Sequence, residues 1–202
     1  MHIAEGVLSL PVLLIGATGA AAGVAVGLKR IDAEMIPRAG IVSAALFVSS
    51  LIHINIGPTS AHLVLNGIGG LILGMGLFPS YLVALFLQAL LFQFGGVVVL
   101  GVNTCTMSLS GVLGGLLGRY VLHLGKPAWL AGALAGATGV AGAGIFTALA
   151  LAGSGEVFFM TAKLILLAHI PIMGIESLIG AFVAAYVFRT MPSLLEEWEK
   201  WK

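Results

Sequence analysis

The first two residues of the chain, Met1 and His2, carry nitrogen atoms that could chelate a metal ion. The α-amine, the amide nitrogen of His2 and its imidazole Nδ1 would close two fused chelate rings on one ion. A fourth nitrogen from elsewhere would complete a flat four-nitrogen set, a geometry of Ni(II) or Cu(II) rather than of tetrahedral zinc. A histidine can occupy the second position by chance, so the pair alone is weak evidence for a metal site. The fourth nitrogen must come from the rest of the chain.

His62 is the candidate for that fourth nitrogen, at the end of the run GPTSAH over residues 57–62. The strip of about seven residues before the first apolar segment reaches at most roughly 20–25 Å at 3.3–3.6 Å per residue, so the chain start can meet His62. The alternative is that His62 caps a turn at the membrane surface. His53 is a candidate to hydrogen-bond groups around the metal or to be an alternative ligand, and the favoured alternative is a hydrogen-bonded interfacial histidine. Ser60 and Asn103 are candidates to hydrogen-bond groups around the metal.

A second polar pair, His169 and Glu176, flanks Pro171 in the last apolar segment. The two residues are seven positions apart and so lie about two turns along one helix face. A proton relay is one interpretation. The favoured one is structural, with these side chains satisfying backbone groups that the proline frees.

The composition predicts a polytopic membrane protein. Of 202 residues, 59% are hydrophobic and 8% are charged, against about 25% charged in soluble domains, and the mean hydropathy is +1.13. The net charge of +1 gives no electrostatic case for nucleic acid. The single cysteine, Cys105, excludes an internal disulfide and a cysteine-based zinc site.

We expect no cleaved leader, because Lys29 and Arg30 follow the first apolar run instead of preceding it. The bulk of His2 is expected to prevent removal of Met1. The sequence contains no catalytic triad, paired catalytic carboxylates, Walker lysine loop or dinucleotide fingerprint. We therefore expect a subunit without enzymatic activity, and any ATP hydrolysis would belong to another chain.

The predicted fold is all-α, with seven transmembrane helices in one bundle and an N-terminal strip inserted into its outer mouth. The predicted segments are residues 8–28, 39–56, 61–78, 81–100, 107–124, 128–152 and 157–188, the last with a break at Pro171. The chain is a single domain, 1–202, made of the strip 1–7, the bundle 8–188 and a cytoplasmic tail 189–202.

The basic residues predict the orientation. With the N-terminus outside and seven crossings, eight of the nine basic residues face the cytoplasm, and only Lys163 does not. The chain start, the turn 57–60 and Asn103 then lie at the outer face of the cytoplasmic membrane.

Glycines at four-residue spacing form a stripe on the first segment, Gly19, Gly23 and Gly27. Such stripes let helix backbones approach closely. Most of the glycine pairs in the chain are expected to serve internal packing, but this stripe is expected to dock on a partner helix.

The residues now collected resemble the CbiM/NikM family, the substrate-binding membrane components of energy-coupling-factor importers for cobalt and nickel. The opening MHIAEGVLS of residues 1–9 is similar to the family's M-H-I-x-[ED]-G-[FY]-L. The run 57–62 is similar to its G-[GP]-[TS]-S-x-H, and the likeness extends to residues 101–103 and 169–176. This chain departs from the pattern at Val7, where the family has an aromatic residue, and at His53.

The resemblance implies that Met1, His2 and His62 hold the metal at the centre of a seven-helix bundle. It also implies partners: a transmembrane coupling protein, two cytoplasmic ATPases and often a small accessory membrane subunit. It gives a role in cobalt or nickel import, the supply route for cobalamin biosynthesis, with the metal as cargo and no resident cofactor. The resemblance leaves open whether the transported metal is cobalt or nickel. The rival interpretations are a substrate-binding component for an organic vitamin, an intramembrane enzyme using His169 and Glu176, and a structural subunit.

Overall fold

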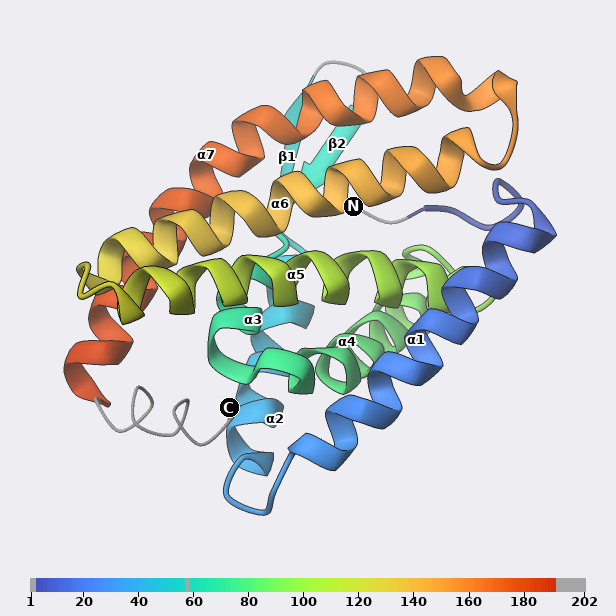
Figure 1. Cartoon of the computed structure of the whole chain (residues 1–202). Helices are drawn as coiled ribbons and strands as arrows, with labels where there is room; N and C mark the ends of the chain where they lie inside the picture. The colour runs from blue at the N-terminus through green and yellow to red at the C-terminus, as the bar shows by residue number, and fades with distance from the viewer. Residues whose placement is uncertain (1–2, 57–58, 192–202) are drawn as a thin grey trace.

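The computed structural model describes residues 3–56 and 59–191, without the side chains of 53–56 and 59–61. Figure 1 shows α5, α6 and α7 side by side, with α3 and α4 against α5 and with α1 crossing α5 and α4. The elements in chain order are α1 (Leu10–Arg30), α2 (Ile36–Ser49), β1 (His53–Ile56), β2 (Thr59–His62), α3 (Asn66–Leu73), η1 (Gly74–Gly76), α4 (Leu77–Phe92), α5 (Leu100–His123), α6 (Ala128–Ala152), η2 (Glu156–Phe158) and α7 (Phe159–Thr190).

The predicted helical membrane bundle is borne out, but the described part of the chain has five helical stretches long and apolar enough to cross a membrane, so the predicted number of seven is not confirmed. They are α1, α5, α6, the stretch 156–190 that contains α7, and the stretch 66–92 formed by α3, η1 and α4. The second predicted segment, 39–56, is divided between α2 and β1. With 14 residues, α2 is about 21 Å long at 1.5 Å per residue, shorter than the roughly 30 Å hydrocarbon layer.

The third predicted segment, 61–78, is a hairpin strand, a short helix and a turn. The strands β1 and β2 pair antiparallel, with the backbone of His53 opposite that of His62. After α3 the helical stretch is interrupted by a turn at η1, so it is not one straight helix; Gly76 of this turn lies beside Ile31, just after α1 ends. The residues of this segment are apolar enough for one long helix, but they form a strand, a short helix and a turn that pack inside the bundle.

The contacts among α3, α5, α6 and α7 depend on missing Cβ atoms. A Cβ at Gly132 would overlap the Gly180 carbonyl, and one at Gly136 would overlap the carbonyl of Glu176. A Cβ at Gly67 would overlap the carbonyl of Ala135. These backbones touch directly, which is how small residues allow membrane helices to associate. Gly132 and Gly136 are a glycine pair at four-residue spacing, and for them the internal packing expected of most such pairs is confirmed.

The glycine stripe of α1 is an internal packing face, so the expectation that it docks on a partner is wrong. Gly19 lies against the Cys105 sulfur of α5, Gly23 against the ring of Phe78, and Gly27 against Met75 and Pro79. The exposed face of α1 carries large apolar side chains, Leu10, Leu14, Ile15, Val26 and Leu28. Four-residue spacing predicts a close helix contact but does not say which helix makes it.

The predicted break at Pro171 is also corrected, because α7 runs unbroken through the proline for 32 residues. A proline removes one backbone donor, whereas a full break would free several polar groups in a region without water. Continuity is therefore the arrangement that leaves fewer groups unsatisfied.

Candidate metal centre

The described strip begins at Ile3, which is fixed to α5 by two hydrogen bonds from one side chain. The Ile3 amide donates to Asn103 Oδ1 at 3.1 Å, and Asn103 Nδ2 donates back to the Ile3 carbonyl at 3.2 Å. Both residues are buried, and the Ile3 side chain packs with Val99, Val102 and Ala148. Met1 and His2 lie outside the described residues.

The chain between Ile3 and α1 lies across the ends of two helices. Glu5 Oε1 accepts a hydrogen bond from the Val98 amide at 3.0 Å, just before α5 begins. The Ser9 amide donates to Ser154 Oγ at 3.1 Å, just after α6 ends. Ile3 and the hairpin residue His62 are both buried, each with 5% of its surface exposed.

The imidazole of His62 has a defined donor and a defined acceptor nitrogen. Its Nδ1 lies 2.8 Å from the Leu63 carbonyl, which can only accept, so Nδ1 carries the proton and Nε2 carries the lone pair. Burial lowers the pKa of His62 below its ordinary 6.5; the Leu63 bond opposes this and nearby His169 adds to it. The neutral ring with an Nε2 lone pair is the form in which histidine binds metals.

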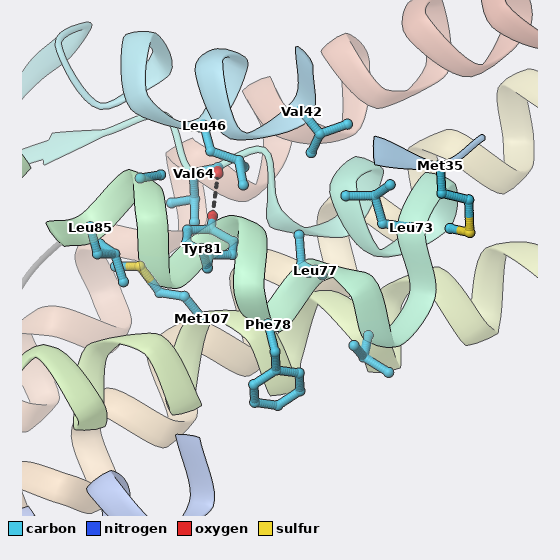
Figure 2. Packing of buried hydrophobic residues seen from close by; sticks show 12 residues of the cluster. Met35, Val42, Leu46, Val64, Leu73, Leu77, Phe78, Tyr81, Leu85 and Met107 are labelled. Carbon is cyan, nitrogen blue, oxygen red and sulfur yellow. Dashed lines mark hydrogen bonds between the residues drawn. The ribbon is translucent and has the colours of Figure 1, made fainter. Parts of the chain in front are cut away.

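The loop that follows His62 is held by α7 and α4. Glu176 accepts hydrogen bonds from the amides of Val64 and Leu65, the latter at 2.9 Å to each carboxylate oxygen. The Tyr81 hydroxyl donates to the Val64 carbonyl at 2.5 Å, the dashed contact in Figure 2. These bonds hold Leu65 in the left-handed conformation, at φ +52°, which a leucine rarely adopts.

Asn66 ties the end of this loop to two further helices. Its Nδ2 donates to Ser110 Oγ of α5 at 2.8 Å and to the Gly139 carbonyl of α6 at 2.9 Å, with the Met107 carbonyl at 3.3 Å. Met107 is one turn from Asn103 on α5, and residues at this spacing are neighbours on a helix surface, about 5–6 Å apart. The strip and the His62 loop therefore meet the same stretch of α5.

The remaining residues predicted for the site can be placed only in part. His53 and Ser60 lie on the paired strands, and their side chains are outside the described part of the structure. Among the residues described, no group of three or more histidine, cysteine, aspartate or glutamate side chains could hold a metal.

His169 and Glu176 do not act on the backbone group that Pro171 frees, which corrects that expectation. The proline leaves the carbonyl of Leu167 without its helical donor. His169 Nδ1 instead contacts the Ile165 carbonyl at 2.7 Å, and Glu176 is directed to the loop before α3. Sequence reasoning missed Asn66 and Tyr81. The signal for Asn66 was an amide in an apolar run, which is costly in a membrane unless it has partners.

Comparisons with known proteins agree on one family. Residues 2–194 match the family model of CbiM, described as the cobalt uptake substrate-specific transmembrane region. A "Putative metal transport protein" of Haemophilus influenzae is 40% identical, covering 98% of each chain. A "Putative fused nickel transport protein NikMN" of Archaeoglobus fulgidus is 29% identical over 98% of this chain and 68% of its own length. A solved structure, described as a transition metal transporter, has a TM-score of 0.77 and 26% identity over 94% and 93% of the two chains.

Proposed function

Because this chain belongs to the CbiM family of cobalt uptake substrate-specific transmembrane regions, we propose that it captures Ni(II) or Co(II) at the outer face of the cytoplasmic membrane. It acts as the substrate-binding subunit of an ATP-driven energy-coupling-factor importer. The metal is cargo. Four nitrogen atoms hold it: the Met1 amine, the His2 amide, the His2 imidazole and the imidazole of His62.

The observation that carries this proposal is the pair of hydrogen bonds between Ile3 and Asn103. They fix the residue next to His2 inside the bundle, on the stretch of α5 that also receives the His62 loop through Asn66. Because consecutive Cα atoms are 3.8 Å apart, this anchoring of Ile3 supports the proposal that His2 acts at that stretch. The Nε2 lone pair of His62 supplies the fourth nitrogen.

The donor set determines the ions that the site accepts. A flat set of four nitrogens suits Ni(II), and Co(II) can use the same donors. Mg(II) and Ca(II) prefer oxygen ligands, and Zn(II) prefers a tetrahedral site, so this geometry disfavours them. Binding displaces protons from the amine and from His2, so affinity falls at acid pH.

Import requires partners that this chain lacks. Two separate ATPases hydrolyse ATP, and a transmembrane coupling protein connects them to this subunit. This assignment is in keeping with the lack of a Walker lysine loop in the sequence given. The nickel transport relative from Archaeoglobus fulgidus is named as a fusion and is longer than this chain, which supports association with further subunits. The N-terminus faces outside and the C-terminus faces the cytoplasm, as the basic residues favour.

The test is Ni(II) binding to the purified full chain by calorimetry. Extending the N-terminus by one residue converts the Met1 amine into a peptide amide and moves the free amine one residue away from the chelate of His2. His62→Ala removes the fourth nitrogen. Each change should abolish tight binding while the protein stays folded. The same extension at the C-terminus and His123→Ala, at an exposed histidine at the end of α5, are matched controls that should bind normally. Tight binding by the protein with a blocked amine would overturn the proposed site.

A further inference from the structure

One peptide group connects the carboxylate of Glu176 to the imidazole of His62. The peptide between Leu63 and Val64 is a rigid plane, with the Leu63 carbonyl and the Val64 amide pointing to opposite sides. The carbonyl accepts the hydrogen bond from His62 Nδ1, at 2.8 Å. The amide of the same peptide donates to Glu176 Oε1. Carboxylate, peptide and imidazole therefore form a continuous chain of hydrogen bonds from α7 to His62.

This chain of hydrogen bonds affects the electron density of the His62 imidazole. A carboxylate that accepts from a peptide N–H polarises the peptide and makes its carbonyl a stronger acceptor. The stronger acceptor holds the Nδ1 proton and increases the electron density at Nε2, the nitrogen with the lone pair. Metal-bound histidines commonly donate their other N–H to a carboxylate or a carbonyl, which fixes the ring and raises its basicity. Here a carboxylate acts on the ring through a carbonyl.

The carboxylate itself is held rigidly. Glu176 is 1% exposed, and its backbone lies against Gly136 of α6, where no Cβ could fit. Its second oxygen accepts from the Leu65 amide at 2.9 Å, so the group is held by two consecutive peptides. Leu65 retains its left-handed conformation under these bonds.

We propose that Glu176 is a positioning residue for the metal ligand His62, which it orients and strengthens through the Leu63–Val64 peptide. The inference rests on the proposed function, because it assigns Glu176 a role only if His62 Nε2 binds the metal. The carboxylate does not contact the ion.

The test is Ni(II) affinity of the full chain with Glu176→Gln. A glutamine keeps the size of the side chain, but it has one acceptor oxygen and would turn an NH2 group toward a peptide N–H. Changes to groups that support a metal ligand typically cost 10–100-fold in affinity, so we expect a loss of about that size. Gln88→Leu is the matched control: Gln88 is a buried amide that bonds the Leu46 carbonyl of α2, and its loss should leave affinity unchanged.

A double-mutant comparison separates positioning from a general structural role. If Glu176 acts through His62, adding Glu176→Gln to His62→Ala should weaken the residual Ni(II) binding no further. In X-ray absorption spectra, Ni(II) bound to Glu176→Gln should show the loss of imidazole nitrogen that His62→Ala shows. If Glu176→Gln costs the same factor with and without His62, or binds as wild type does, the inference is overturned.

Glu176→Asp keeps the inference testable should the glutamine variant fail to fold. The shorter side chain cannot reach both peptides, so a folded aspartate variant with wild-type affinity and spectrum would overturn the inference. Failure of the proposed function gives a different pattern, because the wild-type chain itself would then not bind Ni(II) through its amine and His62. Wild-type binding that depends on His62 but not on Glu176 refutes the positioning role alone.

Discussion

Replacing Asn103 by leucine removes both hydrogen bonds that fix Ile3, with little change in side-chain volume. Each bond contributes about 0.5–1.5 kcal/mol net, so docking of the strip should weaken by about 1–3 kcal/mol. In the proposed site the donors of Met1 and His2 reach the metal only when the strip is docked, so this cost should appear in Ni(II) affinity. At about 1.4 kcal/mol per tenfold, we expect binding to weaken roughly 5–150-fold.

The assay is competition between the full chain and a chelator of known Ni(II) affinity, with thermal unfolding of the metal-free protein as a check on folding. Thr104→Val is the matched control. Thr104 is the next residue on α5 and is fully buried, and its hydroxyl has no hydrogen-bond partner among residues 3–56 and 59–191. If Asn103→Leu bound Ni(II) within about twofold of wild type, or if both variants lost the same factor, the anchoring argument would fail.

Two further predictions concern packing and protonation. Gly23→Leu should destabilise the isolated chain by about 1–3 kcal/mol in thermal unfolding, because the new side chain overlaps Phe78; Gly174→Leu, where nothing lies within 4 Å, should be near neutral. Burial lowers the pKa of His62 below its ordinary 6.5. As the pH falls, this histidine is therefore protonated in the unfolded chain at a higher pH than in the folded protein. Stability should therefore fall as pH drops below about 6.5, and His62→Asn should reduce that fall; an unchanged pH profile would contradict this.

The sequence predicts elements well where one apolar run forms one helix. The predicted segment 128–152 coincides with α6 from Ala128 to Ala152. The prediction fails at 61–78, because hydropathy measures apolar content and not backbone shape. There the chain forms β2, α3 and η1 and turns at Gly74, whose φ is +55°. An irregular backbone at this depth is stable only because other helices cover it, which is information from tertiary structure.

The candidate site shows the same limit. His62 and Asn103 can be identified from sequence, because polar groups in an apolar chain are costly and need a reason to be there. The hydrogen-bond partner of Glu176 cannot be identified from sequence, because Leu65 is 111 residues away along the chain. Nor does glycine spacing on α1 tell an internal contact from an external one, because both require the same absence of side chains.

The network around His62 offers a physical reason for placing one donor of the proposed site on irregular backbone. A helix would direct the carbonyl of Leu63 along its axis to its own amide partner, leaving it unable to accept from His62. Leaving the helix frees that carbonyl, but the freed amides of Val64 and Leu65 must then be satisfied inside the protein. Glu176 satisfies both amides, and Tyr81 satisfies the Val64 carbonyl. The polar groups that keep the loop stable in a membrane are thus the groups that fix the direction of the imidazole. The proposed planar site needs that direction fixed, because its fourth nitrogen must lie in the plane of the other three.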